Sequence, residues 1–136
     1  ELRRRLYHEY VHVVVRYWVG DKVPWWLNEG LAETLSKDFS ERDRARLRDG
    51  NNAGLLFSLA DMEPNQMEQL SLEDFHLAYA QSHATVRYLW EHFGRRFMID
   101  YLEAIGRGTA PEDALRSIYN RTYDILEKEV AHSLGR

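Results

Sequence analysis

Cysteine is absent from the chain, and proline is rare, with three residues in 136. Without cysteine the protein has no disulfide bonds and cannot build a zinc site from thiolates. No stretch approaches the roughly 18–20 consecutive apolar residues of a membrane-spanning helix, so no membrane span is expected in this chain. A secretory signal is not recognisable either, and these features leave the cellular compartment unassigned.

An excess of positive charge is also missing. Lys and Arg number 18 against 22 Asp and Glu, which gives a formal net charge of −4 and a pI of about 5.9. Nucleic-acid-binding domains normally carry a basic surface, so nucleic acid is not an expected partner. Hydrophobic residues make up 44% of the chain. That content can bury a core, and the length predicts a single domain over residues 1–136.

The alternating pattern of a half-buried strand is lacking too, so the chain is expected to be mainly α-helical. Glycines at 94 and 106 are expected to end helices, and residues 50–54 to form a loop. The least regular segment is 55–69, broken at Pro64-Asn65. Helices are predicted over about 2–18, 25–38, 41–49, 72–93, 95–105, 109–119 (opened by a capping box at Thr109 and Glu112) and 122–134.

One five-residue motif stands near the start of the first predicted helix, His8-Glu9-Tyr10-Val11-His12. On a helix, residues four apart share a face and lie about 6 Å apart along the axis, so both imidazoles can reach one Zn²⁺ at roughly 2.0–2.1 Å. In a strand they would stand roughly 13 Å apart, so a metal site requires this valine-rich segment to be helical. Glu9 lies beside the pair and is suited to activate a water at the zinc.

A second motif, Asn28-Glu29-Gly30-Leu31-Ala32-Glu33, falls on the second predicted helix. Hydrolytic zinc sites use three protein ligands, and Glu29 is the best candidate for the third. Gly30 would let two helix backbones approach closely. Glu33, one turn beyond Glu29, is predicted to accept the outer N–H of a ligating imidazole; a surface carboxylate is the alternative. Asn28 is interpreted as an ordinary helix-face residue. Residues 1–38 would then form a zinc-binding helix pair, and 72–134 a C-terminal helical bundle.

The two motifs together resemble the gluzincin branch of the zinc metallopeptidases, in the peptidase MA superfamily. Within it they are most similar to bacterial peptidase MA-like and aminopeptidase N-like catalytic domains. The resemblance implies that His8, His12 and Glu29 bind one Zn²⁺ and that Glu9 is the general base in hydrolysis of a peptide or protein substrate. It also implies that Glu33 orients a zinc-bound histidine. The expected fold is the helical C-terminal part of a zincin catalytic domain.

Further along, Ala78-Tyr79-Ala80-Gln81-Ser82 is similar to a Tyr-x-x-Gly segment of the aminopeptidases, although Ser82 replaces the glycine. The resemblance assigns to Tyr79 a hydrogen bond to the oxyanion of the transition state. A phenol near zinc can stabilise such developing negative charge. Two alternatives are a core aromatic at Tyr79 and an oxyanion donor at His83, one turn beyond it.

Gluzincins carry a β-sheet lobe with a substrate-binding edge strand ahead of the first motif, whereas this sequence has only seven residues before His8. The sheet lobe is therefore expected to be absent from this chain, as in an excised domain. We expect the isolated chain to be weakly active or inactive. We also expect self-association through the apolar surface that a missing sheet would leave exposed.

Two other functions fit the same residues. A helical interaction module could keep zinc for structure alone, which requires a fourth protein ligand such as His83 or His76. A zinc hydrolase that does not act on peptides would use the same ligands, because fold resemblance does not fix the substrate.

Overall fold

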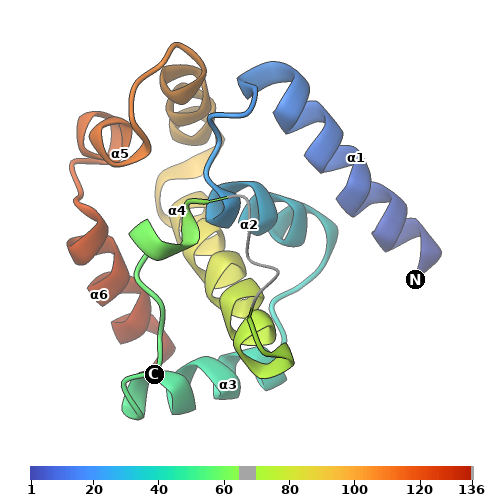
Figure 1. Cartoon of the computed structure of the whole chain (residues 1–136), viewed down its shortest axis with the longest axis vertical. Helices are drawn as coiled ribbons and strands as arrows, with labels where there is room; N and C mark the ends of the chain where they lie inside the picture. Colours follow the sequence, from blue (N-terminus) through green and yellow to red (C-terminus); the bar gives the residue numbers. More distant parts are fainter. Residues whose placement is uncertain (65–69, 136) are drawn as a thin grey trace.

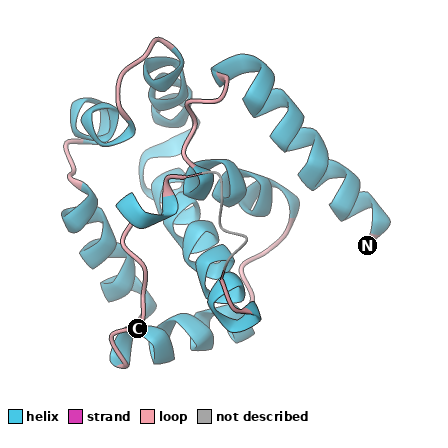
Figure 2. Cartoon of the chain, viewed as in Figure 1, coloured by secondary structure: helices cyan, strands magenta, loops and turns pink. Residues whose placement is uncertain are grey.

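Every regular element in the described part of the chain, residues 1–64 and 70–135 of a computed structural model, is a helix (Figures 1 and 2). The predicted mainly α fold class is confirmed. No helix of the described residues has the length and apolar character needed to cross a membrane. The elements are α1 (Leu2–Val19), α2 (Trp25–Ser36), α3 (Glu41–Asn52), the short 3-10 helix η1 (Ala60–Met62), α4 (Leu72–Gly106), α5 (Pro111–Tyr119) and α6 (Tyr123–Leu134).

Helix α2 lies between α1 and α4 and packs on both (Figure 1). Its Trp26 is completely buried, with ring centroids 6.5 Å from Tyr101 and 5.9 Å from Tyr123. The Trp26 indole donates to the Tyr123 hydroxyl at 3.4 Å, and that hydroxyl donates to a carboxylate oxygen of Glu63. The backbone N–H of Trp25 donates to the Glu63 carbonyl. These contacts attach the start of α2 to α6, so the helix that carries the second motif is anchored in the core.

Helix α1 forms despite its β-branched valines. Val11, Val15 and Val19 are buried at four-residue spacing, which on a helix places them on one face, and this face packs on the rest of the molecule. The other side of α1 remains at the surface and is apolar as well, with Leu6, Tyr10 and Val13 each more than 60% exposed. Tertiary packing of one valine face therefore outweighs the weak helix propensity of these residues.

Helices α2 and α4 approach each other closely at Gly30. A Cβ on Gly30 would collide with the backbone oxygen of Ser82 and with the side chain of Val86. Ser82 is fully buried and interrupts the apolar series of α4 at this point. The prediction that Gly30 permits a close helix approach is confirmed, but the partner is α4 and not the first-motif helix.

Some predicted boundaries need correction. Helix α3 continues through residues 50–52, which were expected to form a loop, because Gly50 is buried against the side chains of Leu56 and Leu77. The cap of α5 is Ala110, so the predicted capping box at Thr109 does not form. Glu112 instead accepts a hydrogen bond from the backbone N–H of Tyr123 at the start of α6. The predicted break at Pro64-Asn65 lies partly outside the described residues.

The predicted helix break at Gly94 is confirmed by the backbone conformation of this residue. The assigned helix α4 runs through it, but Gly94 has φ +86° and ψ 178°, which is not helical. A positive φ of this size is easily adopted only by glycine. The result is two helical halves that meet at a kink, close to the two separate helices that the sequence predicts.

Candidate metal centre

His8 and His12 lie one turn apart on α1, on the side that faces α2. Their ring centroids are 4.6 Å apart with an interplanar angle of 79°, and both side chains are half-buried. The β-branched residues between and after them do not disturb this spacing, since the segment is helical throughout. The two imidazoles therefore converge in the way that the motif predicts for a shared ion.

Glu29 of α2 completes a group of three potential ligands. Its Oε2 lies 3.6 Å from His8 Nε2 and 3.3 Å from His12 Nε2, and its side chain is only 13% exposed. Ligand atoms placed tetrahedrally at about 2.0–2.2 Å from a zinc ion are separated by roughly 3.3–3.6 Å. The two separations between Glu29 and the histidines match this requirement, so Glu29 is placed to bind the same cation as the two imidazoles.

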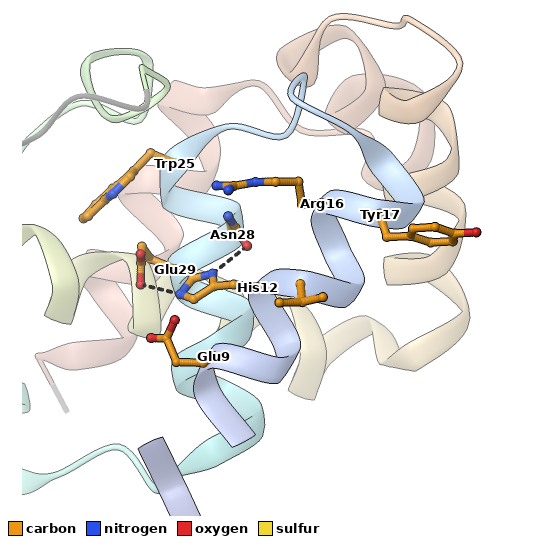
Figure 3. A pocket seen from close by; sticks show the side chains of 8 residues that line it. Glu9, His12, Arg16, Tyr17, Trp25, Asn28 and Glu29 are labelled. Atoms are coloured by element: carbon orange, nitrogen blue, oxygen red, sulfur yellow. Dashed lines mark hydrogen bonds and ion pairs between the residues drawn. The ribbon is translucent and has the colours of Figure 1, made fainter. Parts of the chain in front are cut away.

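Asn28, which the sequence analysis interpreted as an ordinary helix-face residue, contacts His12. Its Oδ1 lies 2.9 Å from His12 Nδ1, and its side chain is buried (Figure 3). Because an amide oxygen only accepts hydrogen bonds, Nδ1 carries the proton and the lone pair of Nε2 faces Glu29. This is the arrangement in which a histidine ligates a metal through Nε2 while a second residue fixes its tautomer.

The facing acceptors need a cation between them. Glu29 Oε2 is buried and has no hydrogen-bond donor among the described residues, although the unprotonated Nε2 lies 3.3 Å away. In the metal-free protein the pKa of His12 is raised, chiefly because a protonated His12 ring donates a hydrogen bond to Glu29. A divalent ion would satisfy the same oxygen and nitrogen lone pairs. The donor set, two imidazoles and one carboxylate, suits zinc.

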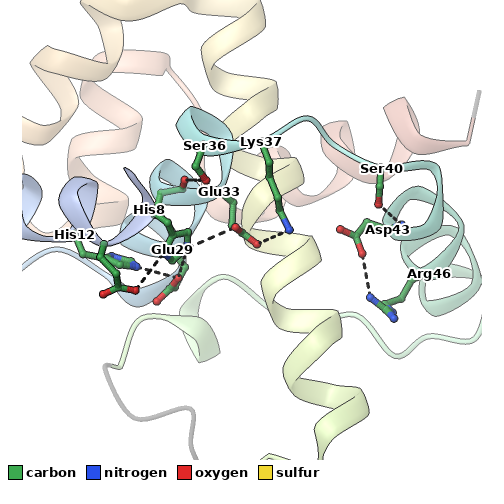
Figure 4. A network of polar contacts seen from close by, with 11 residues as sticks. His8, His12, Glu29, Glu33, Ser36, Lys37, Ser40, Asp43 and Arg46 are labelled. Carbon is green, nitrogen blue, oxygen red and sulfur yellow. Dashed lines mark hydrogen bonds and ion pairs between the residues drawn. The ribbon is translucent and has the colours of Figure 1, made fainter. Parts of the chain in front are cut away.

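Glu33 lies in the same cluster, but in a different position from the one predicted. Its Oε2 is 3.5 Å from His8 Nε2, the nitrogen that also faces Glu29, while its Oε1 pairs with Lys37 Nζ at 3.2 Å (Figure 4). The other ring nitrogen of His8, Nδ1, lies 3.5 Å from Glu9 Oε1. Glu33 therefore borders the space between the ligands, because α2 carries it on the same face as Glu29, one turn further along.

Glu9 is the most exposed acid of the group, with 75% of its side chain accessible. Ligand atoms of His8, Glu9 and His12 all lie within 4.8 Å of one another. Glu9 also lines both of two open hollows, of about 550 and 540 Å³, that lie beside the two histidines. It thus adjoins the metal position and solvent together, as a proton acceptor for an attacking water must.

Tyr79 of α4 lines the hollow on the His8 side. It is half-buried and packs edge-to-face on Trp25, with ring centroids 5.3 Å apart. Burial, and then the nearby carboxylates of Glu29, Glu33 and Glu9, raise the pKa of Tyr79. The phenol is therefore protonated at neutral pH and can donate a hydrogen bond.

His83, the alternative donor, lies elsewhere. Its ring is 1% exposed, packs edge-to-face on Phe39 and lines neither hollow beside the metal ligands. Burial, with Lys37 and Arg87 nearby, lowers the pKa of His83 to about 4. His76 is exposed at the surface of α4. Neither residue joins the metal cluster as the fourth ligand of a closed zinc site.

The structure brings together His8, Glu9, His12, Glu29, Glu33 and Tyr79, and it adds Asn28, the one contact that sequence reasoning missed. The feature of the sequence that could have indicated this contact is the position of Asn28 immediately before Glu29. A family model described as the peptidase MA superfamily matches residues 2–134. Neither the curated proteins nor the solved structures contain a match.

Proposed function

The chain belongs to the peptidase MA superfamily, and on this premise we propose that it is a zinc-dependent metallopeptidase domain that hydrolyses peptide bonds. One observation carries the proposal. Glu29 Oε2 of α2 lies at the separations of a tetrahedral zinc site from both His8 Nε2 and His12 Nε2 of α1. Bound there, zinc would polarise the scissile carbonyl and lower the pKa of a water molecule towards about 7.

The protein's own groups would perform the proton transfers. Glu9 takes the proton of the attacking water and later delivers it to the leaving amine, a role that suits an exposed carboxylate at the junction of both hollows. Tyr79, held protonated by its surroundings, donates to the oxyanion. Asn28 keeps His12 in the tautomer that ligates through Nε2.

Within the superfamily we place the chain nearest to the bacterial peptidase MA-like and aminopeptidase N-like domains. The support is the sequence Trp26-Leu27-Asn28-Glu29-Gly30-Leu31-Ala32-Glu33 and the position of Tyr79 beside it. The substrates would be peptides or proteins that enter along the two hollows.

The decisive test is Glu9→Gln. We expect the variant to keep one zinc per chain, measured by elemental analysis, because it retains His8, His12 and Glu29. Hydrolysis of a peptide panel should fall by roughly 10²–10⁴-fold, the usual loss when a general base is removed. Glu73→Gln, an exposed carboxylate in the first turn of α4, is the matched control and should leave hydrolysis unchanged. Undiminished hydrolysis by zinc-loaded Glu9→Gln would contradict the mechanism.

A second candidate function has one specific observation in its favour. Glu33 Oε2 lies 3.5 Å from His8 Nε2, so Glu33 could serve as a fourth protein ligand and close the site into a structural one. Substitution with Co²⁺ separates the two functions, because an open coordination position binds a hydroxamate and changes the visible spectrum of the ion. A spectrum insensitive to hydroxamate would favour the structural site. A shifted spectrum supports the peptidase.

A further inference from the structure

Four residues at four-residue spacing form a stripe along α1, Arg4, His8, His12 and Arg16. Each step advances about 6 Å along the helix, so the two arginine Cα atoms stand about 18 Å apart with the histidines midway. The metal position is therefore bracketed by one guanidinium on each side.

Arg16 belongs to the hollow on the His12 side, which Trp25, Asn28 and Glu29 also line. In Figure 3 its side chain extends from α1 across the hollow towards Trp25 and Asn28, whereas Tyr17 points away. Arg16 forms no ion pair with any described residue. Glu9 and Glu29 line the same hollow but form no ion pair with Arg16, so this guanidinium beside an aromatic wall is available to bind an anion.

Arg4 belongs to the hollow on the His8 side, together with Arg5, Lys37 and Tyr79. Lys37 is already paired with Glu33 at 3.2 Å. Arg4 and Arg5 are exposed and have no ion-pair partner in the part of the chain that the structure describes. Glu1, Glu9 and Glu33 also line this hollow. Because Glu33 is paired with Lys37, the unpaired guanidiniums of Arg4 and Arg5 share the hollow with Glu1 and Glu9.

The two hollows together are lined by equal numbers of basic and acidic side chains, so the arginines that lack an ion pair, and not a net positive charge, would recognise an anion. Unpaired guanidiniums at both ends of a cleft attract anionic segments and repel cationic ones, so they discriminate between substrates as well as binding them. An extended peptide advances about 3.3 Å per residue, so a separation of about 18 Å corresponds to roughly five residues.

We propose that the cleft selects peptide segments with acidic side chains on both sides of the metal position, roughly five residues apart, with Arg16 binding one carboxylate and Arg4 the other. The proposal rests on the proposed function for the bond that is cleaved, but the binding preference stands on the two arginines alone. These residues are specificity determinants and take no part in the chemical step.

The test compares two fluorescein-labelled decapeptides that differ only in carrying Glu or Gln at positions 3 and 8. Fluorescence anisotropy with the zinc-loaded chain at low salt gives a Kd for each. We expect the Glu peptide to bind about 10-fold more tightly than the Gln peptide, with the difference shrinking at high salt. Arg16→Gln and Arg4→Gln should each weaken binding of the Glu peptide by about 3-fold, as befits exposed charge pairs. The Gln peptide should be unaffected.

Two further variants sharpen the result. Arg48→Gln removes an exposed arginine of α3 that lines neither hollow, and it should leave both Kd values unchanged. The Arg16→Glu variant should bind a decapeptide with Lys at position 3 or at position 8 more tightly than it binds the Glu peptide. Circular dichroism checks that each variant is folded.

Equal affinity for the Glu and Gln peptides, no measurable binding of the Glu peptide, or an Arg48→Gln effect as large as that of Arg16→Gln would each overturn the proposal. A chain that prefers the Glu peptide would support this inference whether or not it cleaves either peptide, because binding and cleavage are measured separately. Cleavage of both peptides with equal kcat/KM would support the function and overturn the inference.

Discussion

Asn28 has a role that a single substitution can isolate. Asn28→Ala removes the acceptor that holds His12 Nδ1–H at 2.9 Å, so His12 can adopt the wrong tautomer. We expect zinc affinity to fall by roughly 10–100-fold, the usual cost of losing such a partner of a metal-bound histidine. Competition with a chromophoric chelator measures this. Asn28→Asp keeps an acceptor and should bind nearly as tightly as the wild type. Asn52→Ala, on the surface of α3, is the control; an unchanged affinity in Asn28→Ala would refute the assignment.

His83 should make the fold sensitive to acid. Burial lowers its pKa to about 4 in the folded state, from the usual histidine value of about 6.5. Between these values the unfolded chain takes up the proton and the folded chain does not. The stability that depends on neutral His83 is therefore complete above pH 6.5 and is lost as the pH falls towards 4, by up to about 3 kcal/mol. Lys37 and Arg87 favour the neutral ring, while Asp38 and Asp43 oppose this.

Urea unfolding at pH 7 and pH 5, in the presence of a chelator, tests this. The wild type should lose about 2 kcal/mol more than His83→Leu between the two pH values, because only the wild type carries the buried imidazole. His92→Gln, which removes an exposed ring, should behave like the wild type. Equal pH dependence of His83→Leu and wild type would show that the buried ring has no part in acid sensitivity.

At the residue scale, the sequence predicts the positions that share a helix face with an identifiable ligand. Glu9, Glu29 and Glu33 can be named as candidates because Glu9 adjoins His8 on one helix, and Glu29 and Glu33 lie one turn apart on the next. Asn28 is different, since an asparagine facing solvent and one facing His12 look identical along the chain. Its contact joins residues 16 positions apart and depends on how α2 lies against α1.

At the scale of elements, Gly30 sets the distance between α2 and α4. Gly30→Ala would place a methyl group against the Ser82 backbone oxygen and the Val86 side chain, and a backbone atom cannot rotate away as a side chain can. The helices would have to separate, at a cost of about 1–3 kcal/mol in unfolding free energy. Glu29 is the neighbouring residue, so zinc affinity should fall too. Urea unfolding and zinc titration measure the two effects.

Gly106→Ala is the matched control for Gly30→Ala. Both glycines are helical, but a Cβ on Gly106 would meet its nearest atom, Val19 Cα, at an ordinary 3.7 Å. Alanine there should be neutral or stabilise by up to about 1 kcal/mol, because alanine favours helix over glycine. If Gly30→Ala were as stable as Gly106→Ala, the close approach would not be a constraint.

The ends of a helix can be predicted where the apolar periodicity and a helix-breaking residue indicate the same position. They are harder to predict where tertiary packing determines whether the helix continues. Gly94 interrupts α4 because its backbone takes a positive φ, a local preference visible in the sequence. Gly50 looked like the start of a loop for the same reason. It is helical because Leu56 and Leu77 pack against it, and such long-range packing leaves no mark in the local sequence.

For the whole molecule, we predict that the chain self-associates through the outer side of α1. An apolar stripe runs along this side, with exposed fractions of 69% for Leu2, 63% for Leu6 and 65% for Val13. A contiguous exposed apolar surface of this kind is normally covered by a partner. Sedimentation velocity should show dimers or larger species, and the double variant Leu6→Glu with Val13→Glu should be monomeric. Ile125→Glu, on the exposed side of α6, is the control. A strictly monomeric wild type at high concentration would contradict this prediction.

The overall class was predictable from the sequence, but the order of packing was not. Helical periodicity and the lack of alternating segments indicate a mainly α chain. That α2 lies between α1 and α4 depends on contacts such as Gly30 with Ser82, which join distant parts of the sequence. Sequence spacing along one helix carries no information on which other helix will lie against it.

The one-sided packing of α1 has a consequence for how the protein resists proteolysis. Two of the three ligands come from this least covered helix and the third from α2, which is anchored to α6 through Trp26 and Tyr123. A bound ion would act as a cross-link between the largely exposed α1 and the core-anchored α2, and so would oppose local opening of α1. If zinc binds as proposed, metal binding and protection of α1 from cleavage would be linked equilibria, and the zinc available would set the lifetime of the protein as well as its proposed activity.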